Sequence, residues 1–313
     1  MNAPMDIPLN TPTIDSQMIP PVAATAAPTR PMYWSVRREL WENRSIYLAP
    51  LIAAAVMLFA FWTRAFHLPA RVRAAEALDS VSSTNLLATP YAISAALIMI
   101  TGFLVAVFYC LDALHGERRD RSILFWKSLP VSDLTTVLSK FSIPMVVIPV
   151  VAFLTIVVMQ LIMRVLSTII LATNGMSAAP VWTQVPFFQM TLVLLYGVAT
   201  VTIWYAPVYS WLLLVSAWAR RNTFLWAIFP PLAICVVEFI VFHTGHFAKM
   251  LGERFNSFHE AFDIVADGGG LVIPYSQLTP GRFLTSSGLW IGLAFAAAFL
   301  AAAIQLRRYR QPI

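Results

Sequence analysis

The chain has 313 residues, of which 59% are hydrophobic and only 12% charged, and its formal net charge is +6. A soluble domain carries charge on about a quarter of its residues, so this composition excludes an ordinary soluble protein and assigns the excess apolar surface to lipid. The basic excess does not indicate a nucleic-acid partner, because Lys and Arg stand in short clusters between apolar runs, as at the ends of membrane spans.

The first 32 residues contain seven prolines and few large apolar residues. Frequent proline breaks helices, and too little apolar surface remains for a core, so we expect a disordered cytoplasmic tail over 1–32. The segment also lacks the apolar stretch of a cleavable signal peptide.

Residues 33–45 have the pattern of an amphipathic helix lying in the membrane interface. One arc is apolar, and Arg38, Glu39 and Glu42 stand opposite it. The same residues would also serve as a charged flank of the first span, and both interpretations stay open. The apolar arc consists of Tyr33, Trp34, Val36, Leu40 and Trp41.

Six apolar runs are long enough to cross a membrane, which takes about 20 helical residues. Backbone polar groups in lipid must bond internally, so each run is expected to be a helix. Pro207 is expected to kink the fourth, which is long for one crossing. The sequence therefore predicts an all-α integral membrane protein with a six-helix domain over 33–313. The spans are expected at 46–66, 91–112, 141–165, 188–217, 223–243 and 288–306.

The distribution of basic residues predicts the orientation of the chain. If both termini are cytoplasmic, fourteen of the 21 Lys and Arg residues lie on the cytoplasmic side and seven on the outer side. Positively charged loops stay in the cytoplasm, so this orientation is favoured. The loop 113–140 is then cytoplasmic, and the segment 244–287 is outside.

The cytoplasmic loop between spans two and three reads HGERRDRSILFWKSLPVSDLTTVLSK over 115–140. A charged helix start leads into an apolar block at 123–126, and Pro130 ends the helix before Ser132 or Asp133 caps the next one. An aromatic anchor with an arginine rim suits docking onto a soluble partner. The block would equally suit the lipid interface, and residue types alone do not separate the two.

This loop resembles the first cytoplasmic loop of ABC-2-type ABC transporter permeases, in which an ER…G-T-L-E-x-L-L-x-x-P-V-S…K pattern links spans two and three. It departs from the pattern at the Gly-Thr step, where this chain has Arg121 and Ser122. The matching positions are Glu117, Arg118, Leu124, Leu129, Pro130, Val131, Ser132 and Lys140.

The resemblance implies that the loop is a coupling helix docking on a separate ATP-binding subunit, two copies of which bind ATP and Mg. Two permease copies, with a homodimer favoured, would form the membrane part in a bacterial inner membrane. The chain has no GxxxxGK[ST] motif, so it is expected to be neither an enzyme nor a cofactor carrier. The residues implied in coupling are Glu117, Arg118, Arg121, Leu124, Phe125, Trp126 and Pro130.

Glu238 is an ionisable residue inside the fifth run, where a charge costs about 2.5–3.5 kcal/mol and normally faces a cavity or a partner. It would line a substrate path, or brace helices through hydrogen bonds. His243 and His246 follow it, but their spacing places them on diverging faces, so no metal site is predicted.

Span four carries a polar and aromatic stripe that suits either a translocation path or helix packing. In transporters of this type the stretch before the last span can close the outer gate, and 272–283 is the candidate here. The stripe residues proposed for the path, together with Glu238, are Thr200, Thr202, Tyr205 and Tyr209.

We therefore expect the permease subunit of an ATP-driven exporter that moves an amphipathic or hydrophobic substrate outward, such as a lipid, peptide or drug-like molecule. Membrane lipid is an expected partner and nucleic acid is not. Two alternatives stay open: an intramembrane enzyme centred on Glu238, and a non-transporting sensor or assembly factor driven by the ATPase.

Overall fold

The computed structural model describes residues 30–120, 131–255 and 277–309. The described elements all belong to one compact unit, residues 31–313. These elements are helices without exception, which confirms the predicted all-α class for the described part of the chain. The predicted tail at 1–32 lies almost wholly outside the described residues.

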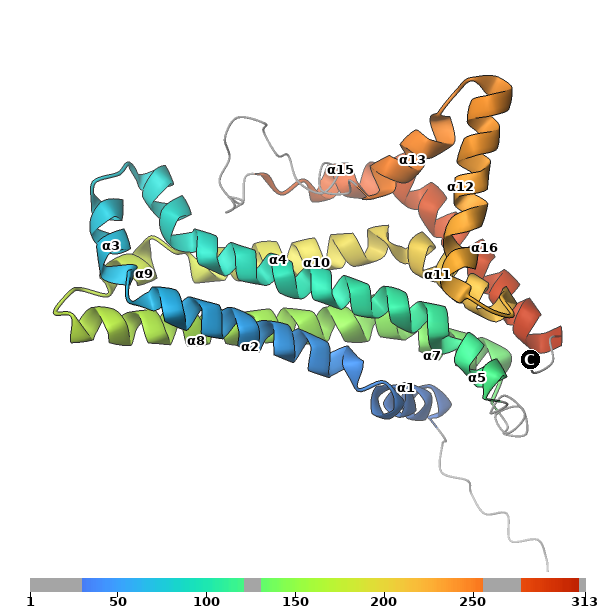
Figure 1. Ribbon diagram of the computed structural model, residues 1–313, viewed down its shortest axis with the longest axis horizontal. Helices are drawn as coiled ribbons and strands as arrows, with labels where there is room; N and C mark the ends of the chain where they lie inside the picture. Colours follow the sequence, from blue (N-terminus) through green and yellow to red (C-terminus); the bar gives the residue numbers. More distant parts are fainter. Residues whose placement is uncertain (1–29, 121–130, 256–276, 310–313) are drawn as a thin grey trace, which may run out of the picture. The chain divides into compact units, whose positions relative to one another are not determined.

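Six segments in the described ranges are long and apolar enough to cross a membrane, which confirms the predicted number. They are built from α2 (Ser45–Ala65), α4 (Ser80–Ala113) with α5 (His115–Arg119), α7 (Asp133–Ser142) with the π-helical turn η1 (Ile143–Val147) and α8 (Ile148–Thr173), α9 (Ala179–Thr183) with α10 (Phe187–Trp204), α12 (Thr223–Phe242), and α16 (Ser287–Tyr309). The other helices are α1 (Pro31–Glu42), α3 (Leu68–Glu76), α11 (Ala206–Trp218), α13 (His246–Phe255) and α15 (Pro280–Thr285). Helices α2, α4, α8 and α10 run side by side, whereas α12 stands at a steep angle to them (Figure 1).

The fourth apolar run is broken between α10 and α11 at Tyr205. Pro207 causes the break, because it has no N–H for the carbonyl four residues earlier and instead fits the first turn of a new helix. The kink predicted at this proline is therefore confirmed.

The third helical segment extends to Thr173, beyond the predicted end at 165. Arg164 lies one residue before that predicted end. In the structure the Arg164 side chain is buried, its Nη2 donates to the carbonyl of Val185 at 2.6 Å, and its guanidinium stacks against the ring of Trp182. An arginine that has hydrogen-bonding and aromatic partners inside the protein does not interrupt its helix.

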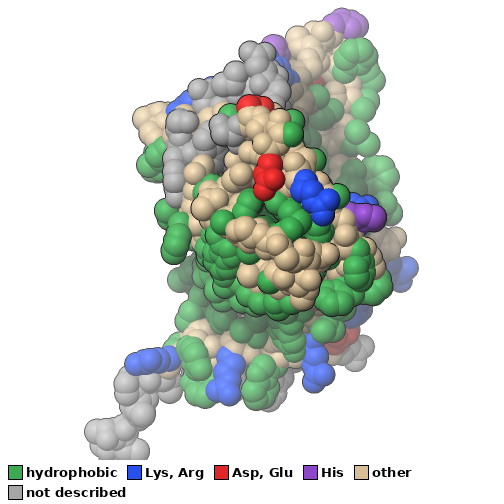
Figure 2. All heavy atoms as spheres, turned by 90° about the vertical axis from the view of Figure 1, so that its left-hand side faces the viewer, with side chains coloured by type: hydrophobic (Ala, Val, Ile, Leu, Met, Phe, Trp, Pro, Cys, Tyr) green, Lys and Arg blue, Asp and Glu red, His purple; other side chains and the backbone are tan. Residues whose placement is uncertain are grey.

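The outer surface of the helices is strongly apolar. Seen from the end at which α3 and α9 lie, hydrophobic side chains cover much of the flank and charged ones are few (Figure 2). Phe59, Ile100 and Phe108 are 70%, 57% and 63% exposed. Exposed apolar surface on this scale is unfavourable in water and is covered by lipid in a membrane protein.

Candidate functional site

Three acidic and three basic side chains meet at the base of the loop 113–140, where α1, α5, α7 and α16 come together. Four of the six, Glu39, Glu117, Lys140 and Arg307, have at most 8% of their surface exposed. We refer to the six as the charge cluster. Its members are Arg38, Glu39, Glu117, Asp133, Lys140 and Arg307.

Glu117 lies at the centre of the charge cluster. Its Oε1 is 3.1 Å from Nη2 of Arg38 and 3.2 Å from Nζ of Lys140. Its Oε2 accepts a hydrogen bond from Nη1 of Arg307 at 3.1 Å. One carboxylate of α5 thus joins three helices that are distant in sequence.

The remaining contacts extend the charge cluster on both sides. Nζ of Lys140 donates to Oε1 of Glu39 at 2.8 Å, and the hydroxyl of Tyr109 donates to Oε2 of the same carboxylate at 2.8 Å. Nε of Arg307 donates to Oδ1 of Asp133 at 3.0 Å. Three formal negative charges balance three positive ones, so the cost of removing them from water is offset only while all partners stay in place.

A second set of contacts fixes α5 to the end of α11. The hydroxyl of Ser216 accepts hydrogen bonds from the backbone N–H groups of Leu114 and His115, at 3.0 and 2.8 Å. Nη1 of Arg118 donates to the carbonyls of Ala217 and Ala219, at 2.7 and 3.2 Å. Free carbonyls and the negative dipole end of a helix favour a cation here, so α5 and α11 hold each other's ends.

These contacts change the interpretation of two predicted coupling residues. Glu117 and Arg118 were expected to contact a partner, yet their side chains are 8% and 5% exposed and bind groups within the chain. Their position supports the base of the loop and leaves little surface for a partner. The other predicted coupling residues, Arg121, Leu124, Phe125, Trp126 and Pro130, lie outside the described residues.

The predicted N-terminal amphipathic helix corresponds to α1. Two residues of its charged arc face the protein, since Glu39 is 3% exposed and Arg38 bonds to Glu117, whereas the side chain of Glu42 is 53% exposed. Its aromatic arc faces outward, with Trp34 and Trp41 58% and 71% exposed. The location of α1 in the membrane interface stays a prediction.

A cleft of about 510 Å³ lies between α4, η1 and α8, α10 and α11. Small residues such as Ala95, Gly102 and Ala152 help to create the space. The lining contains no Asp, Glu, Lys, Arg or His among the described residues. This volume falls within the range of about 300–1,000 Å³ that is usual for small-molecule sites.

Three of the predicted path residues line this cleft: Thr202, Tyr205 and Tyr209. Thr200 does not, and its hydroxyl donates to the carbonyls of Tyr196 and Gly197 within α10.

Gln160 also lines the cleft, although the sequence analysis did not single it out. It is 3% exposed, and it is an uncharged polar residue in an apolar run. That local contrast is the signal that would have identified it.

Glu238 lies away from the cleft and braces two helices. Its Oε1 accepts from the hydroxyl of Thr244 at 2.9 Å and from the backbone N–H of His246 at 2.8 Å, and its Oε2 accepts from that of Phe247 at 2.8 Å. A carboxylate at the first N–H groups of α13 is a helix cap. His243 ends α12, and no cluster of potential metal ligands occurs in the parts of the chain that the structure describes.

Arg254 of α13 is a contact residue that the sequence analysis missed. Its Nη2 donates to the carbonyl of Gly288 at 2.9 Å, and its guanidinium lies 4.4 Å from the ring centre of Trp204. Nε1 of Trp204 in turn donates to the carbonyl of Arg254 at 2.8 Å. Gly288 and Trp204 are 34 and 50 positions away from Arg254, so no local sequence pattern predicts these contacts. The predicted outer-gate stretch, 272–283, is described only from 277, and its last residue packs beside Trp204.

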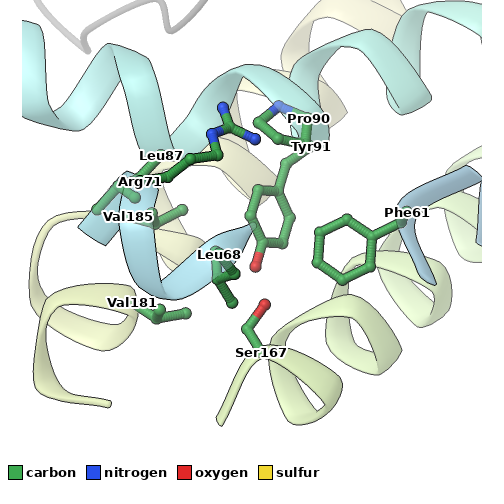
Figure 3. A pocket seen from close by; sticks show the side chains of 9 residues that line it. All are labelled: Phe61, Leu68, Arg71, Leu87, Pro90, Tyr91, Ser167, Val181 and Val185. Atoms are coloured by element: carbon green, nitrogen blue, oxygen red, sulfur yellow. The ribbon is translucent and has the colours of Figure 1, made fainter. Parts of the chain in front are cut away.

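A second hollow lies near α3 and α9, at the end of the helices away from the charge cluster (Figure 1). Its volume is about 20 Å³, and Figure 3 shows the rings of Phe61 and Tyr91 and the hydroxyl of Ser167 directed toward it. This space holds little more than one water molecule, whose minimum requirement is roughly 10–15 Å³. It is a packing defect between helices and no ligand site.

Comparison with family models, curated proteins and solved structures finds no match to this chain.

Proposed function

We propose that the chain is the membrane-spanning subunit of an exporter driven by separate ATP-binding subunits. The observation that carries the proposal is the charge cluster, which connects the base of the loop 113–140 to α1, α7 and α16 through buried contacts. A docked motor protein needs such a connection, because force applied to a loosely attached loop would not reach the spans.

The connection continues from the loop to the cleft. α7 passes through η1 into α8, and Ile148 and Ala152 of α8 line the cleft. On the other side α5 follows α4, which supplies Ala95 and Gly102. A displacement of the loop would therefore move two walls of the cleft together.

The cleft favours an exporter over a sensor or assembly factor, because a purely mechanical device needs no cavity of this size beside its moving helices. The hydrogen bonds of Glu238 favour the same choice over an intramembrane enzyme, since three donors within the chain already occupy its oxygens. In the proposed arrangement two permease copies and two ATPases assemble in a bacterial inner membrane, with both termini cytoplasmic and MgATP bound only by the ATPases.

The test is purification of the full chain in mild detergent, followed by mass spectrometry of the proteins that copurify. We expect an ATPase with a Walker motif, and we expect Phe125→Ala combined with Trp126→Ala to remove it while the permease still inserts. Phe188→Ala is the matched control, because this aromatic side chain is 83% exposed and lies in the first turn of α10, outside the loop. An undiminished ATPase yield with the double variant would contradict the docking role.

Transport is tested in proteoliposomes containing the permease and the copurified ATPase. ATP-dependent flux of an amphipathic dye supports the exporter, and ATPase binding without flux of any amphipathic probe supports the sensor or assembly factor.

A further inference from the structure

We propose that the cleft between α4, α8, α10 and α11 binds an uncharged amphiphile, with its apolar chain along α8 and hydrogen-bonding groups at Gln160 and Tyr209. This inference rests on the proposed function, because it names the substrate class of that exporter. On this proposal, ions and charged headgroups do not bind in the cleft.

The shape of the cleft indicates an elongated ligand. Its wall on the third span runs from Pro144 to Gln160, which corresponds to about 24 Å at a helical rise of about 1.5 Å per residue. Most of this wall is apolar, with Ile148, Pro149 and Ala152 among its residues. A single hydrocarbon chain fits such a surface better than a compact polar molecule.

The charge of the lining determines the charge of the ligand. None of the described lining residues is acidic, basic or histidine. An ion placed in an apolar cleft without a counter-charge loses its hydration and gains no partner, and the cost is several times that of an uncharged hydrogen-bonding group. The cleft therefore selects against carboxylates, phosphates and quaternary amines.

Two buried polar side chains supply the hydrogen bonds. Gln160 is 3% exposed, and its Nε2 has only a long contact of 3.5 Å to the carbonyl of Tyr91. Tyr209 is 5% exposed, and no other described residue hydrogen-bonds its hydroxyl. A buried polar group without a good partner is costly, so a ligand hydroxyl, ester or amide that binds one of them gains affinity.

The test uses three probes with the same hydrocarbon chain and different heads: 1-palmitoylglycerol, palmitate and cetyltrimethylammonium, each with a photoreactive diazirine in the chain. The full-length protein is held in phosphatidylcholine nanodiscs at a pH at which palmitate is ionised, and labelled peptides are mapped by mass spectrometry. We expect the palmitoylglycerol probe to label the cleft walls at least about tenfold more than either charged probe.

Matched variants locate the site. Ala96 lines the cleft and has an exposed side chain, so Ala96→Trp fills the space without a clash in the core and is expected to abolish labelling. Leu97 is the next residue, is 38% exposed and does not line the cleft, so Leu97→Trp is expected to label normally. The head of the palmitoylglycerol probe reaches one end of the cleft, so at least one of Gln160→Leu and Tyr209→Phe should reduce labelling several-fold with no loss of folded protein.

Equal labelling by all three probes would overturn the inference, because it would show a cleft filled by surrounding lipid without selection. Unchanged labelling in Ala96→Trp would overturn it as well. Either result together with a copurifying ATPase and ATP-dependent flux would leave the proposed function intact, whereas selective labelling without an ATPase partner would contradict the proposed function alone.

Discussion

Arg307 in the last span donates from Nη1 to Oε2 of Glu117 at 3.1 Å, although 190 positions separate the two residues. Their side chains are 4% and 8% exposed. The contact attaches α16 to the start of the loop 113–140, so the loop cannot move alone. A buried ion pair of this kind is weak evidence of net stabilisation, but its disruption is costly, because one charge is left buried without a partner.

Glu117→Ala is expected to lower the free energy of unfolding by about 3–5 kcal/mol, because Arg38, Lys140 and Arg307 would remain together without their shared carboxylate. The measurement is the midpoint of thermal unfolding in detergent. Asp120→Ala is the control, since this carboxylate is 63% exposed and only three positions away. An equal midpoint for the two variants would show that the charge cluster does not hold the helices together.

Arg118→Met and Arg119→Met make the same chemical change at neighbouring positions, and we expect their effects on stability to differ sharply. Arg118 is 5% exposed and bonds to two carbonyls at the end of α11, whereas the side chain of Arg119 is 61% exposed. We expect Arg118→Met to cost at least about 1.5–3 kcal/mol and to weaken stimulation of the ATPase by substrate. Arg119→Met should match the parent protein in thermal unfolding. Loss of activity in Arg119→Met alone would indicate that the exposed arginine performs the coupling.

Gly292→Ala is expected to destabilise the protein by about 1–3 kcal/mol, because the added methyl group would overlap Nη2 of Arg254 and displace it from Gly288 and Trp204. A double-mutant cycle tests this cause. Once Arg254→Ala is present, the added methyl group should cost little, so the double variant should unfold at the temperature of Arg254→Ala alone. Gly281→Ala is the control, since nothing lies within 4 Å of the position of its methyl group. Additive losses in the double variant would refute the overlap.

Glu238→Gln should loosen α13 and leave transport intact. The carboxylate of Glu238 accepts hydrogen bonds from Thr244, His246 and Phe247. A glutamine amide has only one oxygen, and its NH₂ group would face one or more of these donors. We expect faster hydrogen exchange in α13 with unchanged ATP-dependent flux. Glu253→Gln, on an exposed face of the same helix, should change neither. Complete loss of an activity that needs no ATPase would instead favour the intramembrane enzyme.

The six spans and the break in the fourth were predictable, because each follows from a local property of the chain. A helix that crosses lipid needs a continuous apolar run. Pro207 has no N–H group to continue the hydrogen bonds of the preceding helix, so the run breaks there. The bounds were less predictable. α4 begins at Ser80, eleven residues before the predicted start, because its polar first turns are capped by Asp79 rather than buried in lipid.

The arrangement of charge was decided by the tertiary structure. The sequence placed Glu117 and Arg118 on a partner-facing loop and left Glu238 either on a substrate path or bracing helices, since an isolated charge near a membrane span indicates function. In the structure their partners come from residues between 6 and 190 positions away. The apolar runs therefore determined that this chain forms six helices able to cross a membrane, because each run meets that requirement through its own length and hydropathy. Which charges are buried and which polar groups face the cleft depended on contacts between distant segments, which only folding brings together.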